Sequence, residues 1–238
     1  MQKDGWIPRE QILGAEAMER VPGEFLSQHV GQANPPTFLL TIERLMTQDL
    51  SASQRSTLMQ LYPFVVKWFK WFAKSQSGFG KGVFRWRGRD VNDGKLNHMT
   101  LTSGLDDYPR AAKPSKDERH VDLLSWVIKG AEVMGSFATL AGEDGEAAKF
   151  NAQREELLGK LDELHWNDKV GYYCDAGQHS NKGKFKQFVV IKCSTADRSS
   201  TTEALTPAEN PTNKCPSSHP QFMWQLGDGQ GGLMMREK

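Results

Sequence analysis

The chain lacks several features that would assign it to a broad class of protein. No run of eighteen apolar residues occurs in its 238 residues, so we predict no membrane-spanning helix. The net charge is only +1, which gives no reason to expect nucleic acid or an anionic membrane as a partner. The three cysteines, Cys174, Cys193 and Cys215, show neither zinc-ligand spacing nor a CxxC pair, so no metal site is predicted.

Targeting signals are lacking as well. Residues 1–9 contain no apolar segment of the kind that signal peptides carry. Proline follows Asn210, which excludes that asparagine as a glycosylation acceptor. We therefore expect neither a signal nor a membrane anchor within this chain.

Helical periodicity dominates what is present. Apolar residues recur at helical spacing in segments at about 10–20, 38–46, 61–72, 118–141 and 146–165. Pro63 is expected to start or kink the helix that contains it. Helices of this length joined by loops predict an all-α fold.

The segment 84–110 is the most informative part of the sequence. It lies in a stretch with little helical character, and it gathers tryptophan, tyrosine, four arginines and four aspartates. Apolar rings beside carboxylates suit a sugar, and a carboxyl among them can protonate a glycosidic oxygen. Composition alone also allows a solvated charged loop.

Six motifs carry a family resemblance. They are Trp-Ile-Pro-Arg-Glu (6–10), Asn-Pro-Pro-Thr (34–37), Arg-Trp-Arg-Gly-Arg (85–89), Thr-Ser-Gly-Leu-Asp-Asp-Tyr-Pro-Arg (102–110), Glu-Arg-His-Val-Asp-Leu (118–123) and Leu-Asp-Glu-Leu-His-Trp (161–166). In this order they resemble the processing α-glucosidase I, or mannosyl-oligosaccharide glucosidase, family (glycoside hydrolase family 63). The resemblance extends over about residues 4–185.

The resemblance implies a fold and an activity. The fold is an (α/α)6 toroid, of which this chain would form an incomplete part. The activity is hydrolysis, with inversion, of the terminal α-1,2-linked glucose from the glucosylated high-mannose glycan on new glycoproteins. The family works in the endoplasmic reticulum, in its lumen or at its membrane, and neither a metal nor an organic cofactor is expected.

The resemblance also implies the catalytic acid. Inversion needs one carboxyl that protonates the leaving oxygen and a second that activates water on the opposite side of the sugar. In related trehalase-like sequences the acid lies in a Ser-Gly-x-Asp motif, which corresponds here to residues 103–106. Asp106 is therefore the predicted general acid. The neighbouring Asp107 is the alternative, or it binds sugar hydroxyls.

Further residues are candidates for substrate binding. Arginine forks suit hydroxyls and carboxylates, and aromatic rings suit the faces of glucose. The structural alternatives are ion pairs for the arginines, core packing for the rings and, for Arg110, a role in holding the loop. The candidates are Trp6, Arg9, Trp86, Arg87, Arg89, Asp107, Tyr108 and Arg110.

One expected part is missing. The family carries its general base in a later Trp-Glu-x-Tyr type motif, and the chain has no such motif. We therefore interpret residues 1–190 as a partial catalytic domain and residues 191–238, rich in Ser, Thr and Pro, as a divergent and disordered tail. The chain is expected to be truncated and inactive alone. A trehalase-like toroid glycosidase and a non-catalytic glycan-binding fragment are the alternatives.

Overall fold

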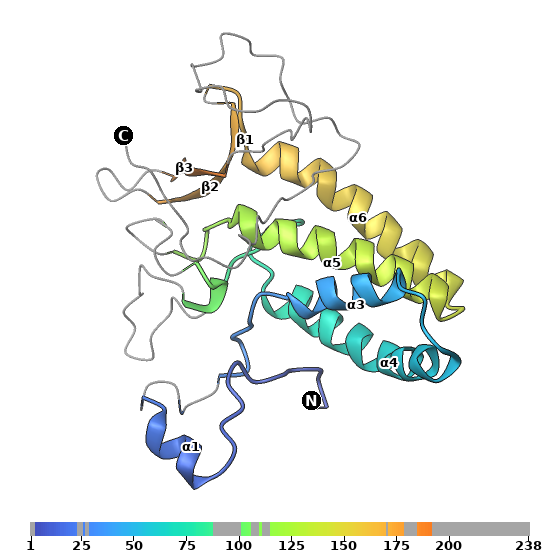
Figure 1. The fold of residues 1–238 in the computed structure, drawn as a ribbon. Helices are drawn as coiled ribbons and strands as arrows, with labels where there is room; N and C mark the ends of the chain where they lie inside the picture. The colour runs from blue at the N-terminus through green and yellow to red at the C-terminus, as the bar shows by residue number, and fades with distance from the viewer. Residues whose placement is uncertain are drawn as a thin grey trace, which may run out of the picture.

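The computed structural model describes residues 3–22, 26, 29–87, 101–105, 110, 115–169 and 171–178, and the backbone of a strand at 185–191. This part of the chain is mostly helical, as the apolar periodicity predicts, and Figure 1 shows its arrangement. The helices are α1 (Ala15–Arg20), α3 (Phe38–Met46), α4 (Ala52–Ser75), the 3-10 helix η1 (Leu101–Ser103), α5 (Val121–Leu140) and α6 (Asp144–His165). None of the described helices is both long and apolar enough to cross a membrane.

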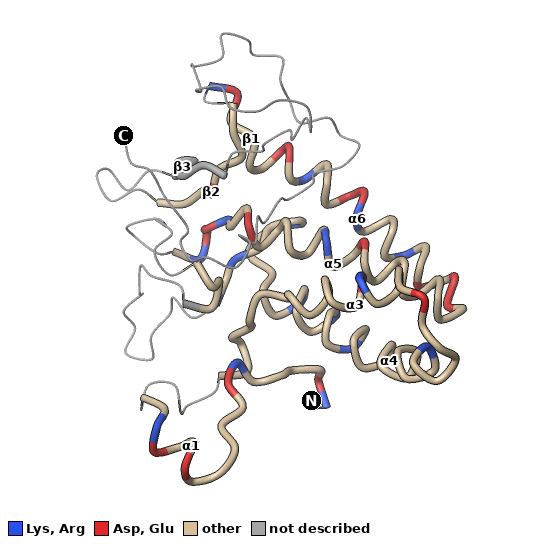
Figure 2. The backbone as a smooth tube through the Cα atoms, in the orientation of Figure 1, with Lys and Arg blue, Asp and Glu red and all other residues tan. Residues whose placement is uncertain are grey.

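Helix α5 is the centre of the fold. It lies between α6 on one side and α3 and α4 on the other (Figure 1). Fifteen of its residues are buried, because its sequence is apolar on nearly every face. Helix α6 differs, since charged positions recur along its length (Figure 2) and it buries only a narrow apolar stripe.

Gly130 allows α5 to approach α4 closely. A methyl group added at Gly130 would lie 2.3 Å from Cε2 of Phe69, so only glycine fits between the two helices. The Phe69 ring in turn meets Phe150 of α6 edge-on, at a centroid distance of 5.9 Å. A glycine inside a helix reduces its stability by about 1 kcal/mol relative to alanine. Here that loss is offset by the contact between three helices.

Helix α4 is longer than the apolar spacing predicts. It begins at a capping box in which the Ser51 hydroxyl accepts from the Gln54 N–H while the Gln54 side chain accepts from the Ser51 N–H. Pro63 does not start it but lies inside it. The capping signal ahead of residue 52, rather than the proline, sets the start of this helix.

A small antiparallel sheet follows α6 and was not expected from the sequence. Its order is β1 (Trp166–Asn167), β2 (Tyr172–Gln178) and β3 (Phe185–Ile191). Gly171, at φ +70°, makes the turn between the first two strands. The backbones of Arg119 and Ala176 exchange two hydrogen bonds, at 2.8 and 3.0 Å, which attach β2 to the segment just before α5.

Helix α1 is shorter than predicted. It starts at residue 15 rather than near residue 10, because Gly14 precedes it at φ +86° and breaks the helical path. None of its residues is buried, and it lies apart from the other helices (Figure 1).

Candidate active site

Motifs that are distant in the sequence meet near the N-terminal segment. Arg9 Nε donates to Oδ1 of Asn34 at 3.0 Å, and Asn34 Nδ2 donates to the Arg9 carbonyl oxygen at the same distance. Gly104, at φ +70°, lies against Pro35, so that a methyl group added there would be 3.3 Å from the proline Cγ. Three of the six motifs are therefore neighbours in space.

The backbone that leads to the predicted acid is anchored. Thr102 Oγ1 donates to the carbonyl oxygen of Arg87 at 2.6 Å. The Leu105 N–H donates to Ser103 Oγ at 3.1 Å. Thr102 and Ser103 are both buried. Asp106 directly follows this segment and lies outside the described residues, as do Arg89, Asp107 and Tyr108.

A buried ion cluster is formed by Arg110, the next described residue after Leu105. Arg110 Nη1 and Nη2 donate to the two carboxylate oxygens of Asp122 at 2.9 and 2.8 Å, in a bidentate pair. Arg110 Nη1 also donates to Oδ2 of Asp175 at 2.5 Å. No side chain of the three is more than 1% exposed. We call Arg110, Asp122 and Asp175 the Arg110 cluster.

A helix and a strand supply the two carboxylates of this cluster. Asp122 lies in the first turn of α5 and Asp175 in the middle of β2. Asp175 Oδ1 also accepts the Val121 N–H at 2.8 Å, which places a carboxylate at the positive end of α5. Arg110 is therefore bonded to a helix and a strand at once.

The cluster contains two carboxyls for one guanidinium. Burial raises the pKa of Asp175 to about 6; the nearby Asp122 adds to this shift, and Arg110 opposes it. Burial opposes the charge of Arg110, but Asp122 and then Asp175 outweigh it and raise the arginine pKa above its ordinary value. The guanidinium therefore stays charged at any relevant pH.

Trp86 extends this network into the core. Its indole Nε1 donates to Oδ2 of Asp122 at 2.9 Å, and its backbone N–H donates to Nδ1 of His120 at 3.0 Å. Because Nδ1 accepts, the ring proton lies on Nε2, which is 2.9 Å from Oε2 of Glu118. Trp86 is fully buried, and its ring packs edge-on against Phe72. In this structure its ring offers no open face to a sugar.

Two other candidate residues make structural contacts. Trp6 is 4% exposed, and its Nε1 donates to the Gln32 carbonyl oxygen at 3.4 Å. Arg87 donates from Nε to the Ser75 carbonyl oxygen at 3.0 Å and from Nη2 to that of Ser77 at 2.5 Å. A cation suits this position because α4 ends there with unsatisfied carbonyl groups.

Neither Asp122 nor Asp175 was predicted from the sequence as a site residue. Each is the only charged residue in an apolar stretch, Asp122 within residues 121–128 at the start of α5 and Asp175 within Tyr-Tyr-Cys-Asp-Ala-Gly of β2. A charged residue in such a context is buried only when it is paired. That pattern was the available signal, but it does not identify the partner.

His165, where α6 ends, is buried and neutral. Its Nδ1 donates to the Cys174 carbonyl oxygen at 2.8 Å, and Nε2 has no hydrogen-bond partner within the described part of the chain. Burial lowers its pKa to about 4. In the residues that the structure describes, no three His, Cys, Asp or Glu side chains gather as metal ligands.

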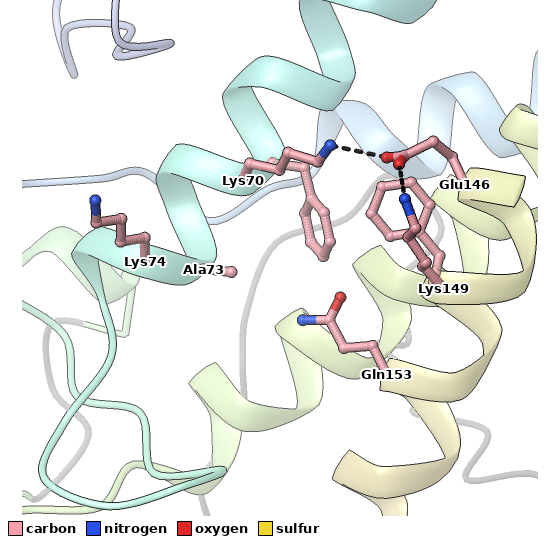
Figure 3. Close-up of a pocket in the computed structure, with 8 residues that line it drawn as sticks. Lys70, Ala73, Lys74, Glu146, Lys149 and Gln153 are labelled. Carbon is pink, nitrogen blue, oxygen red and sulfur yellow. Dashed lines mark hydrogen bonds and ion pairs between the residues drawn. The ribbon is translucent and has the colours of Figure 1, made fainter.

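A separate pocket of about 410 Å³ lies between α4 and α6 (Figure 3). Glu146 joins Lys149 and Lys70 there, with each Nζ–O distance at 2.8 Å. The hydrogen bonds from Lys149 and Lys70 lower the pKa of Glu146 to about 2. A carboxyl that holds its proton so weakly cannot protonate a leaving group near neutrality. Glu146 is therefore not suited to act as a general acid, and we call this pocket the Lys70 pocket.

Comparison with known proteins agrees with the motif pattern. The model of the glycosyl hydrolase family 63 C-terminal domain matches residues 1–215. The chain belongs to this family. It is 43% identical to mannosyl-oligosaccharide glucosidase GCS1 of Arabidopsis thaliana, over 76% of this chain and 23% of the relative. It is 38% identical to Alpha-glucosidase 2 of the same plant, over 76% of this chain and 25% of the relative.

A fungal relative extends the comparison. The probable mannosyl-oligosaccharide glucosidase of Schizosaccharomyces pombe is 35% identical, over 74% of this chain and 26% of the relative. The chain thus spans about a quarter of the length of these curated relatives. Family membership and a relation to glucosidases follow from these matches.

Proposed function

We propose that this chain supplies the general-acid side of an inverting α-glucosidase. The substrate is the glucosylated high-mannose N-glycan, from which the terminal α-1,2-linked glucose is removed in the endoplasmic reticulum. The observation that supports the proposal most strongly is the position of residues 106–109 in the chain. They are bounded by anchored Leu105 on one side and by buried Arg110 on the other.

In the proposed reaction, Asp106 donates its proton to the glycosidic oxygen while the bond from that oxygen to the anomeric carbon breaks. A second carboxylate removes a proton from water, and the resulting oxygen attacks the opposite face of the sugar. The glucose leaves with inverted configuration, and both proton transfers balance. The sequence contains no Trp-Glu-x-Tyr type motif, which the family resemblance implies for the general base, so we expect no turnover by this chain alone.

The proposed architecture is the (α/α)6 toroid. It is supported by α5, which is buried on nearly all sides, and by α6, which carries charge along its outer face. In a double ring of helices, the inner helices are covered on all sides and the outer ones on a single face. The division of the chain at residue 190 remains a prediction.

A chimera tests the role of Asp106. Residues 4–185 would replace the matching segment of the Arabidopsis mannosyl-oligosaccharide glucosidase, and glucose release from an α-1,2-glucosyl glycan would be measured. We expect Asp106→Asn to reduce the rate by about 10² to 10⁴-fold, the contribution of a general acid. α-Glucosyl fluoride needs no protonation of its leaving group, so its hydrolysis should fall by less than about tenfold.

Asp107→Asn is the matched control for the adjacent carboxyl. If Asp107 is the acid instead, the two variants exchange their behaviour. Nuclear magnetic resonance of the first-formed product should show β-glucose, because the α-linkage is inverted. A folded chimera that hydrolyses trehalose but not the glycan would contradict the proposed substrate. Equal loss on both leaving groups for both variants would contradict the acid assignment.

A further inference from the structure

We propose that two copies of this chain form a symmetric dimer by exchanging N-terminal arms, so that the arm of each copy docks on helix α4 of the other. The arm is defined as residues 10–22, and the α4 face as Leu61, Phe64 and Lys67. The inference is independent of the proposed catalytic role, because it concerns an interaction surface and the partner that fits it.

The first argument is the location of the exposed apolar side chains. Four of the large ones in the described part of the chain precede α3, two lie on α4 and one lies elsewhere; they are Leu13, Met18, Leu26, Val30, Leu61, Phe64 and Phe79. Leu61 and Phe64 are three positions apart and therefore lie on the same side of α4. Exposed apolar residues that gather in this way mark interaction sites, whereas scattered ones need no explanation.

The second argument is that the two surfaces carry opposite charge. The arm contains Glu10, Glu16 and Glu19 against a single arginine, Arg20. Helix α4 has no acidic residue, and Lys67 is exposed three positions after the phenylalanine of the α4 face. Contact between two arms, or between two α4 faces, would bring like charges together, which disfavours both arrangements. The arm and the α4 face are therefore complementary in charge as well as in apolar character.

The third argument is the position of the base of the arm. Trp6 Nε1 donates to the Gln32 carbonyl oxygen at 3.4 Å, so the chain leaves and returns at one place. A methyl group added at Gly5 would lie 2.5 Å from the carbonyl oxygen of Lys67, which shows that this base rests directly on α4. From there α1, which has no buried residue, lies apart from the other helices (Figure 1).

This placement suits a closed pair. Because each arm starts beside its own α4, a two-fold axis that brings one arm to the neighbouring α4 brings the second arm back in the same way. Both arms and both α4 faces are then occupied, and no face is left open for a third copy. Exchange of an identical element between two copies is a low-cost route to a dimer.

The first test measures the association of the purified full chain by sedimentation equilibrium over a series of concentrations. We expect a reversible dimer with a Kd of about 1–100 μM, since two arms of this size bury less surface than a standard interface. Phe64→Ala should raise the Kd by at least about tenfold, because the symmetric interface contains this ring twice.

Phe79→Ala is the matched control for the loss of an exposed ring. Phe79 is 67% exposed and lies outside both surfaces, so its removal should leave the Kd unchanged. Phe64 is 58% exposed, and the circular dichroism spectra of both variants should therefore match that of the wild type. An equal effect of the two substitutions on the Kd would overturn the inference.

The second test reverses one charge on each surface. Glu19 and Lys67 take part in no ion pair with the residues that the structure describes, so Glu19→Lys and Lys67→Glu break no existing pair. Each variant alone should raise the Kd by about tenfold, because like charges then meet at both arms. An equimolar mixture of the two variants should form a heterodimer with the wild-type Kd, since each arm then meets an α4 face of opposite charge.

Each other result overturns the proposal. A chain that stays monomeric at every concentration shows that the arm does not dock on a second copy. Failure of the mixture to recover the wild-type Kd shows that the arms are not exchanged. An open series of larger oligomers shows that the contact does not close into a pair. None of these measurements depends on glucose release, so failure of the proposed function leaves the test intact.

Discussion

The Arg110 cluster and the ion pairs of the Lys70 pocket mirror each other in charge but differ in burial. In the Arg110 cluster, one cation lies between two carboxylates, and each side chain is at most 1% exposed. In the Lys70 pocket, one carboxylate lies between two lysines whose side chains are 58% and 76% exposed (Figure 3). The bond lengths are similar, so geometry alone does not rank them.

Burial explains why the two clusters should behave differently. At the surface, water and salt screen the attraction, and each lysine loses freedom when it is held. In the interior, the charged groups have lost their contact with water and interact only with each other. Removal of one partner therefore leaves a buried charge that nothing compensates. A buried cluster is therefore costly to break, whereas an exposed one is weakly coupled to stability.

The largest expected effect comes from Arg110→Ala. This change leaves Asp122 and Asp175 buried without their cation, so we expect the free energy of unfolding to fall by about 3–5 kcal/mol. Urea denaturation followed by circular dichroism measures it. Arg154→Ala, which breaks pairs at the α5–α6 surface, is the control and should cost less than about 1 kcal/mol. Similar losses in both variants would refute the distinction between the two kinds of cluster.

The next largest effect is a pH dependence of the free energy of unfolding, which comes from the buried His165. In the unfolded chain His165 binds a proton near pH 6.5, but in the folded chain it does so only near pH 4. The unfolded state therefore gains protons first as the pH falls, and about 3 kcal/mol of stability is lost between pH 6.5 and 4.

His165→Asn isolates this contribution, because its amide can still donate to the Cys174 carbonyl while lacking a titratable ring. The difference in unfolding free energy between wild type and variant should shrink by about 3 kcal/mol as the pH falls from 6.5 to 4. A constant difference over that range would show that the histidine does not titrate as proposed. Asp175, whose pKa is raised, contributes in the opposite direction in both proteins and cancels in the comparison.

The smallest effect is expected for Glu146→Gln in the Lys70 pocket. The lowered pKa of Glu146 means that its contribution is present above pH 4.5 and disappears as the pH falls toward 2. Because the lysines are exposed, the change in urea midpoint should be small at neutral pH and absent in 1 M salt. A loss as large as that of Arg110→Ala, and insensitive to salt, would contradict the comparison.

The helices could be predicted from the sequence because their signals are local. The apolar spacing placed the two long helices at about 118–141 and 146–165, and they occur as Val121–Leu140 and Asp144–His165. The errors also have local causes. Gly14 shortened α1, and the Ser51 capping box lengthened α4 beyond its apolar core.

The sheet was missed because its strand signal was weak in isolation. Residues 172–178 read Tyr-Tyr-Cys-Asp-Ala-Gly-Gln and do not alternate between apolar and polar side chains. In the structure, five consecutive positions of β2 are buried, so the strand has no solvent-facing side that would produce such an alternation. β3 does contain β-branched residues, which favour strands, but its pairing with β2 joins segments that no periodicity connects. Contacts of that kind depend on the tertiary fold.

The sequence by itself determined the family, the helical character and the motif that holds the predicted acid. These depend on residue order and short spacing, which a linear reading preserves. Only the tertiary structure decided how the motif residues are used: Trp86 is buried in the core, Arg87 bonds the end of α4, and Arg110 is enclosed by two aspartates. The physical reason is that burial and pairing are properties of three elements meeting in space. Asp122 and Asp175 are 53 positions apart in the chain, and nothing in either segment alone shows that both bind one arginine.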